Sequence, residues 1–132
     1  MTVDAALPHA VRGFLDAINA RDLEAAAEHL TDDVSYHLLM PHPAVTGRGA
    51  VLEALGGAVL AADRVDWEVI SCLADDRRAF VERIDRFYFG DREASIECLG
   101  VFELRGDKIS AVRDYADLET WRRRKEAARQ TS

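Results

Sequence analysis

The chain has 132 residues, of which 48% are hydrophobic, so it can bury one core and is not a disordered chain. Its formal net charge is −7 and no basic stripe precedes the C-terminus, which argues against a nucleic-acid partner. No apolar run is long enough to span a membrane, and the segment MTVDAALPHA lacks the basic start and apolar middle of a signal peptide. We therefore expect a cytoplasmic protein with no membrane partner.

Apolar residues at helical spacing and helix-capping residues predict that the first half of the chain is mainly helical. Pro8 suits the first turn of one helix, Asp22 suits the N-cap of the next, and Gly47 stands just before another. The predicted order is helix, helix, strand and helix, over residues 8–20, 23–30, 34–40 and 48–61.

From residue 65 the apolar pattern changes from helical spacing to strand alternation, interrupted by short turn signals. Asp117 is placed to cap a C-terminal helix. Helices followed by a meander of strands indicate an α+β fold, in which a curved mixed or antiparallel sheet wraps over N-terminal helices and encloses an apolar pocket. We expect a single domain over residues 1–132. The predicted strands cover residues 65–74, 78–89, 93–105 and 108–117, and the last helix covers 118–130.

Three charged side chains interrupt otherwise apolar strand faces. Arg83 and Asp85 share the apolar face of one predicted strand, and Asp114 lies on that of another. Such residues are almost never fully buried unless they are paired. Tyr36 adds a phenol from the apolar face of the first strand. In one curved sheet these side chains would converge on a cavity whose substrate-binding walls we expect to be Leu38, Phe87, Ile96, Cys98, Val112 and Trp121.

Two carboxylates bridged by a guanidinium in a cavity cannot both keep ordinary acidities. One shared proton leaves a carboxylic acid and a carboxylate near neutral pH, which supplies a general acid and a general base without a metal or cofactor. A structural salt-bridge network, with Tyr36 as an ordinary core tyrosine, would produce the same pattern of residues.

Several motifs occur together along the chain: NARD, YHLLMPHPAVTGRGAV, ERIDRF, LGVFEL followed by GDKI, and RDYAD. In this combination the sequence resembles the limonene-1,2-epoxide hydrolase family, within the NTF2-like or SnoaL-like superfamily. The resemblance extends over nearly the whole chain. Its specific part is Arg-x-Asp on one strand with RDY-x-D two strands later.

The resemblance implies an α+β cone and one-step, cofactor-independent hydrolysis of epoxides. It implies that Asp114 is the base that activates water, Asp85 the acid that protonates the epoxide oxygen, and Arg83 the bridge between them. It also implies that Tyr36 helps to hold the water. The family has an Asn two residues after this Tyr, where the present sequence has Leu38. Either His37 turned inward by a bulge, or a backbone carbonyl of the LLMPHP segment, would have to replace it.

The remaining chemistry-bearing residues indicate no further site. The four histidines lack metal-ligand spacing, so we expect no metal, and Cys72 and Cys98 are interpreted as free buried thiols. The outer face of the sheet, opposite Arg83, carries Phe80, Ile84 and Tyr88. That outer face is too apolar to be fully solvated, which predicts a homodimer through it.

The first functional hypothesis is therefore an epoxide hydrolase that adds water to a small apolar epoxide to give a vicinal diol. A ketosteroid-isomerase-like isomerase or a polyether-type epoxide cyclase would use the same acid and base. A non-catalytic ligand-binding or dimerisation module is the third hypothesis.

Overall fold

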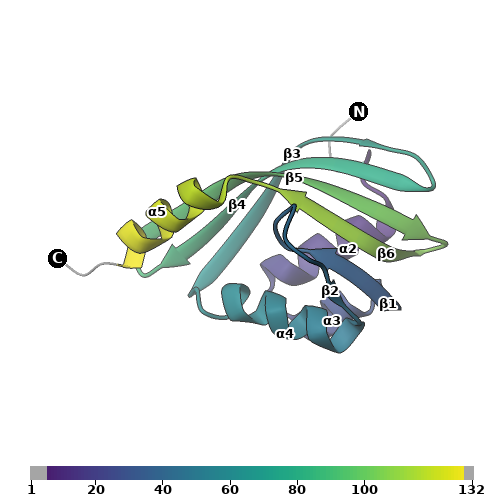
Figure 1. Ribbon diagram of the computed structural model, residues 1–132, viewed down its shortest axis with the longest axis horizontal. Helices are drawn as coiled ribbons and strands as arrows, with labels where there is room; N and C mark the ends of the chain where they lie inside the picture. Colours follow the sequence, from purple (N-terminus) through teal and green to yellow (C-terminus); the bar gives the residue numbers. More distant parts are fainter. Residues whose placement is uncertain (1–5, 130–132) are drawn as a thin grey trace.

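The computed structural model describes residues 6–129. Its helices pack on one side of a sheet that is built mainly of long strands (Figure 1). In chain order they are α2 (His9–Asn19), α3 (Leu23–Ala27), β1 (Leu30–His37), β2 (Val45–Thr46), α4 (Arg48–Val59), β3 (Arg64–Ala74), β4 (Arg78–Phe89), β5 (Arg92–Arg105), β6 (Lys108–Tyr115) and α5 (Leu118–Arg129).

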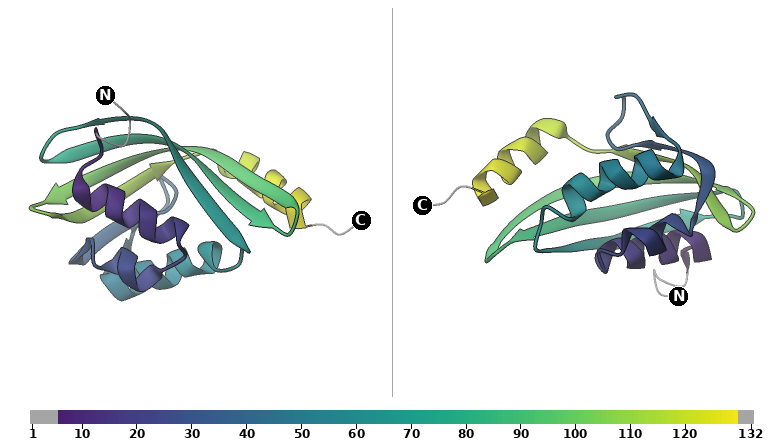
Figure 2. Two further views of the ribbon diagram at one scale, coloured as in Figure 1. Left: turned by 180° about the vertical axis from the view of Figure 1, so that it is seen from behind. Right: turned by 90° about the horizontal axis from the view of Figure 1, so that it is seen from below.

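The six strands form one sheet in the order β2-β1-β6-β5-β4-β3. Neighbouring strands are antiparallel except β1 and β6, which run parallel, so the sheet is mixed. The long strands β3 to β6 form a meander, because each is joined to the next by a short turn. The sheet arches over α2, α3 and α4, while α5 lies at the far end of the long strands (Figures 1 and 2).

The core lies between α2 and the concave face of the sheet. Phe14 of α2 is fully buried and contacts the rings of Tyr36 on β1 and Phe102 on β5, at centroid distances of 6.2 and 6.3 Å. The apolar stripe of α2 has the 3.6-residue period that a sheet-facing helix needs. This packing fixes β1 and β5, which carry parts of the candidate site.

The predicted boundaries around the first strand were wrong. The second helix ends at Ala27 and β1 begins at Leu30, within the segment that was predicted to be helix and turn. Leu30 is fully buried and pairs with Ile109 of β6, so strand pairing and burial outweigh the turn preference of the Thr-Asp-Asp segment. The strand also ends early, at His37, and the two-residue strand β2 was not predicted. Gln130, the last residue of the predicted C-terminal helix, lies outside the described residues.

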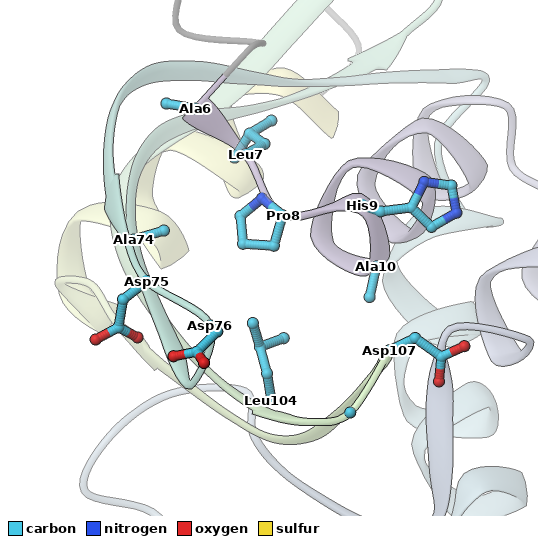
Figure 3. Close-up of a pocket in the computed structure, with 11 residues that line it drawn as sticks. Ala6, Leu7, Pro8, His9, Ala10, Ala74, Asp75, Asp76, Leu104 and Asp107 are labelled. Carbon is cyan, nitrogen blue, oxygen red and sulfur yellow. The ribbon is translucent and has the colours of Figure 1, made fainter.

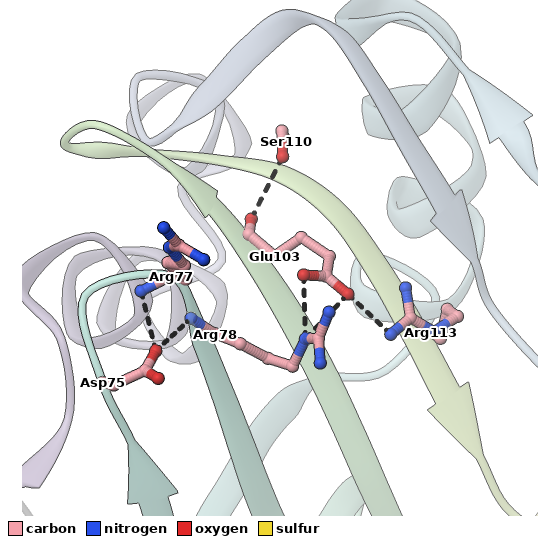
Figure 4. Close-up of polar contacts among 6 residues, drawn as sticks. All are labelled: Asp75, Arg77, Arg78, Glu103, Ser110 and Arg113. Carbon is pink, nitrogen blue, oxygen red and sulfur yellow. Dashed lines mark hydrogen bonds and ion pairs between the residues drawn. The ribbon is translucent and has the colours of Figure 1, made fainter.

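Charged groups tie strands together on the convex face. Glu103 of β5 accepts hydrogen bonds from Arg78 of β4 at 2.9 and 3.0 Å and from Arg113 of β6 at 2.8 Å (Figure 4). Arg113 therefore lies on the face opposite Asp114, because successive side chains of a strand point to opposite faces of the sheet. Exposed Phe80 contributes to the apolar part of this face. The homodimer through this surface stays a prediction.

No helix within residues 6–129 is long and apolar enough to cross a membrane.

The open edge of the sheet is held by one side chain of α2. Asn19 Oδ1 accepts a hydrogen bond from the backbone N–H of Trp67 at 2.7 Å, and its Nδ2 donates to the Trp67 carbonyl at 3.3 Å. Trp67 belongs to β3, whose outer edge pairs with no other strand among residues 6–129. The Asn19 amide therefore takes the place of a neighbouring strand at this residue.

We expect Asn19→Ala to lower the free energy of unfolding by about 1–3 kcal/mol, because it leaves two partly buried backbone groups unpaired. Chemical denaturation measures the change. Asp16→Ala is the matched control, since Asp16 is an exposed residue of the same helix, and it should change stability by about 0.5 kcal/mol or less. Equal stability of both variants would contradict a role for Asn19 at the sheet edge.

Candidate active site

An apolar cavity of about 230 Å³ lies on the concave side of the sheet, between the sheet, α4 and α5. Carboxylates of β4 and β6 and the phenol of β1 stand among its apolar side chains. The lining residues are Tyr36, Leu38, Leu39, Leu55, Ala58, Trp67, Asp85, Phe87, Ile96, Cys98, Asp114, Ala116, Leu118 and Trp121.

Arg83 is the centre of the polar group beside this cavity. It is 0% exposed, and Asp85 and Asp114 are each 6% exposed. Arg83 Nε and Nη2 donate to the two carboxylate oxygens of Asp85 at 2.8 and 2.9 Å, and Nη2 lies 3.3 Å from Asp114 Oδ2. One guanidinium therefore joins both acidic side chains, across strands β4 and β6 that are separated by β5.

Tyr36 completes the group from β1. Its hydroxyl donates to Asp114 Oδ2 at 3.2 Å. Burial, together with the charge of Asp114, raises the pKa of the Tyr36 phenol well above its ordinary value, so the phenol remains neutral and available as a donor. The parallel pairing of β1 with β6 sets Tyr36 opposite Val112, two residues from Asp114, which explains the contact.

Asp114 is held by its backbone as well as its side chain. The carbonyl of Asp114 accepts a hydrogen bond from the Met40 N–H at 2.8 Å, which ties the segment after β1 to the site. Burial raises the pKa of Asp114 above its ordinary value, although Arg83 and Tyr36 act to lower it. Asp114 is therefore a stronger base than a carboxylate in water.

The charge of Arg83 persists despite complete burial. Burial acts to lower the pKa of the guanidinium, but the charges of Asp114 and Asp85 outweigh it and raise that pKa well above its ordinary value. The guanidinium carbon lies 5.2 Å from the ring centroid of Trp67, within the range of a cation–π contact.

Gly100 of β5 makes room for this arrangement. A Cβ there would lie 2.4 Å from Arg83 Nη1 and 2.8 Å from Asp114 Oδ1, which are distances that real Cβ atoms do not tolerate. Both polar atoms are buried and lack a hydrogen-bond partner within the described residues. The sequence interpretation missed Gly100, although a glycine inside a strand often marks a close approach of this kind.

Cys98 is a neutral part of the same wall. Its Sγ lies 3.2 Å from Arg83 Nη2, which donates to it. Burial raises the pKa of the Cys98 thiol, so it is neither ionised nor a strong nucleophile at neutral pH. Cys98 and Cys72 are both free thiols, but only Cys98 is buried as predicted, because Cys72 is half-buried.

The predicted side chains are distributed as follows. Four of them form one connected group, in which Tyr36 bonds to Asp114 and Arg83 joins Asp114 to Asp85. Val112 is fully buried in the core and does not line the cavity. The predicted wall residues that do line the cavity are Leu38, Phe87, Ile96, Cys98 and Trp121.

His37 does not take the place of the Asn that the resembled hydrolases have at the position of Leu38. Its Nδ1 lies 2.9 Å from the His42 carbonyl oxygen, within the loop that follows β1, and it is not a lining residue of the cavity. In the same loop the Leu39 carbonyl accepts from the His42 N–H at 2.9 Å. Leu38, 37% exposed, faces the cavity at the position of the family Asn.

A second hollow, of about 370 Å³, lies between the start of α2 and the turns at Asp75–Asp76 and Gly106–Asp107 (Figure 3). Its acidic side chains have no basic or nucleophilic partner among the lining residues apart from His9. Within residues 6–129, no group of three or more His, Cys, Asp or Glu is arranged to hold a metal ion.

We expect Gly100→Ala to lower the free energy of unfolding by about 1–3 kcal/mol and to displace Arg83, because the added methyl would overlap the buried atoms Arg83 Nη1 and Asp114 Oδ1. Urea denaturation measures the loss. Gly57→Ala is the control, since a Cβ there meets nothing within 4 Å and Gly57 lies in helix α4. That change should be neutral or stabilising by about 0.5–1 kcal/mol. A Gly100→Ala protein as stable as the Gly57→Ala protein would contradict the close packing at β5.

Comparisons with known proteins agree with this fold. An LEH-like epoxide hydrolase of M. tuberculosis has a TM-score of 0.75 at 24% identity, covering 96% of this chain and 92% of that chain. A putative polyketide cyclase from Xanthomonas campestris pv. campestris has a TM-score of 0.73 at 22% identity, covering 85% and 90%. A hypothetical protein from Catenulispora acidiphila with a ketosteroid isomerase-like fold, in complex with trimethylamine, has a TM-score of 0.78 at 15% identity, covering 95% and 98%.

These structures confirm the predicted α+β cone of NTF2-like type. A family model described as a SnoaL-like domain matches residues 11–112, which include Tyr36, Arg83 and Asp85. Because that match covers most of the sequence, the chain belongs to the SnoaL-like family.

Proposed function

We propose that this protein is a cofactor-independent epoxide hydrolase that adds water to a small epoxide and gives a vicinal diol. The observation that carries the proposal is the buried Asp114–Arg83–Asp85 group, with Tyr36 bonded to Asp114, beside an otherwise apolar cavity. An epoxide hydrolase needs a base for water and an acid for the leaving oxygen within reach of one substrate. The similarity to a structure named as an LEH-like epoxide hydrolase supports this choice.

In the proposed reaction Asp114 removes a proton from a water molecule as the water oxygen bonds to an epoxide carbon. The bond between that carbon and the epoxide oxygen breaks, and the oxygen takes a proton from Asp85. The diol has then gained one water, Asp114 holds the proton and Asp85 is ionised. Return of the proton from Asp114 to Asp85 restores the starting state.

The charges around the pair favour this direction of proton transfer. Arg83 donates to both oxygens of Asp85, which stabilises the carboxylate that forms when Asp85 gives up its proton. Burial strengthens Asp114 as a base, and Tyr36 holds that carboxylate in a fixed orientation. One guanidinium therefore contacts both acids of the proposed mechanism.

The side chains that line the cavity determine which class of substrate it can bind. Phe87 and Trp121 pack together at a centroid distance of 4.9 Å, and Ile96 and Leu55 complete an apolar lining. No Lys or Arg lines the cavity among the described residues, so its walls do not favour phosphate or carboxylate groups. The substrate is a small molecule with a hydrocarbon body.

Leu38 favours a second candidate function, that of an epoxide cyclase. Where the resembled hydrolases hold water with an Asn, Leu38 offers no hydrogen bond, and water would be held by Asp114 and Tyr36. A substrate with its own hydroxyl group would need no bound water, and the same acid and base would close it to a cyclic ether. Acid–base isomerisation uses the same two groups, and a polyketide cyclase and a ketosteroid isomerase-like protein are among the structures with this fold.

In ¹⁸O-labelled water we expect the protein to convert a hydrocarbon epoxide such as 1-methylcyclohexene oxide to a diol that carries one solvent oxygen. Asp85→Asn and Asp114→Asn should each lower the rate by about 10²–10⁴-fold, because each removes an acid–base group. Asp91→Asn is the matched control, since Asp91 is an exposed acid outside the cavity, and it should keep the wild-type rate.

Each other outcome selects a different function. Rates close to wild type in either cavity variant would remove that carboxylate from the mechanism. Unlabelled cyclic ether from a hydroxy-epoxide, with no labelled diol, would favour the cyclase. Folded protein that turns over no epoxide but binds a small apolar ligand would favour a non-catalytic binding module.

We also expect kcat/KM to fall at the acid end of its pH profile. As pH falls, Asp114 becomes protonated and can no longer accept a proton from water, which produces the acid limb. Burial raises the pKa of Asp114, so the acid limb should lie above the ordinary value of 3.8. Tyr36→Phe removes a hydrogen bond that lowers this pKa and should move the limb to higher pH. An acid limb at or below 3.8, or one that Tyr36→Phe leaves in place, would contradict Asp114 as the base.

A further inference from the structure

Trp67 presents a polar group that the proposed reaction does not use. Its side chain lines the cavity and is 6% exposed, and its indole Nε1–H has no hydrogen-bond acceptor within the described residues. A buried indole N–H nearly always finds a partner, because leaving it unpaired forfeits its hydration without a replacement.

None of the neighbouring side chains within the described residues accepts a hydrogen bond from this N–H. The amide of Asn19 is engaged by the backbone of Trp67 itself. Phe87 packs against the indole at a centroid distance of 6.1 Å, and the Arg83 guanidinium, which is only a donor, lies 5.2 Å from its ring. Asp85 is directly opposite Trp67 across strands β3 and β4, yet its two oxygens are oriented toward Arg83 and neither accepts a hydrogen bond from the indole.

The position of Trp67 separates it from the water side of the cavity. Across the sheet, Tyr36 stands on β1, Asp114 on β6, Asp85 on β4 and Trp67 on β3, in the strand order β1-β6-β5-β4-β3. The bonds made and broken in the proposed reaction lie between Asp114 and Asp85. The indole is one strand beyond Asp85, on the side away from the attacking water.

We propose that the Trp67 indole N–H donates a hydrogen bond to an acceptor oxygen of the ligand, distinct from the epoxide oxygen. The ligand class is a compact hydrocarbon skeleton that carries one neutral acceptor, such as a ketone or an ether. If the proposed hydrolase function holds, on which the word substrate rests, an epoxide that carries such an additional oxygen is a better substrate than a pure hydrocarbon epoxide. A site built around a buried donor binds a ligand without the matching acceptor less well, because the donor then stays unpaired.

The donor can be observed directly, without any turnover. The chain has two tryptophans, so a ¹H–¹⁵N spectrum contains two indole N–H signals, which Trp67→Phe and Trp121→Phe assign. We use cyclohexanone and methylenecyclohexane as probes, since they have similar shape and only the ketone can accept a hydrogen bond. Trp121 lines the same cavity and serves as the internal measure of occupancy.

At equal occupancy we expect the Trp67 indole proton to move downfield with cyclohexanone and not with methylenecyclohexane. We also expect Trp67→Phe to reduce the ratio of the two affinities, ketone over alkene, by about two- to tenfold, which is the effect of one hydrogen bond. The same ratio, taken from kcat/KM for an epoxide with a ring ketone and its hydrocarbon analogue, should fall by a similar factor.

The outcomes distinguish this inference from the hydrolase proposal. A selective ketone shift without turnover of either epoxide keeps the Trp67 donor and removes the hydrolase function. Turnover of both epoxides with no ketone-selective shift, or with an unchanged ratio in Trp67→Phe, overturns the donor role and keeps the hydrolase. Failure of cyclohexanone to shift the Trp67 signal at any concentration overturns the inference as well.

Discussion

The buried charge of Arg83 is the constraint on which the rest of the site depends. A guanidinium with no exposed surface has lost its hydration, and this loss is tolerable only if anions and acceptors surround it. Asp85, Asp114 and Cys98 supply those partners, and Gly100 keeps its own position empty of side chain so that they fit. The same contacts that stabilise the charge also hold two carboxylates close together, so one structural requirement creates an acid–base pair.

The shape of the sheet determines where this pair faces. Strand β1 pairs in parallel with β6, the last strand of the meander, and this pairing brings Tyr36 into contact with Asp114. The long strands continue beyond those helices, and side chains of α4 and α5 enclose the space that remains, among them Leu55 and Trp121. The polar group is therefore next to a cavity that is largely apolar, where little water would compete with the proposed acid and base for a bound ligand.

Proteins with this fold differ in what their cavities do, because the fold fixes the cone and leaves the lining free to vary. In this chain two lining residues give the cavity its own character. Leu38 offers no hydrogen bond on the side where the proposed reaction places the water, and Trp67 presents a donor that has no partner within the described residues. Under the proposals above, both residues bear on which oxygen atoms a ligand should carry, and neither takes part in the contacts among Arg83, Asp85 and Asp114.

The sequence by itself determined the α+β class, most element positions and the convergence of Arg83, Asp85, Asp114 and Tyr36, because strand alternation fixes which residues share a face. Tertiary contacts decided the rest. Residues 30–33 look like a helix end and a turn, yet Leu30 joins the sheet because a partner strand distant in the sequence buries it against Ile109. Alternation also placed Val112 on the cavity wall, but a shared face does not say which of its residues the helices cover, and Val112 is packed in the core. The sequence could not indicate the roles of Gly100 and Trp67, because both depend on which side chains the neighbouring strands bring close. Gly100 matters because a side chain there would overlap Arg83 and Asp114, and Trp67 matters because no acceptor within the described residues pairs with its indole N–H.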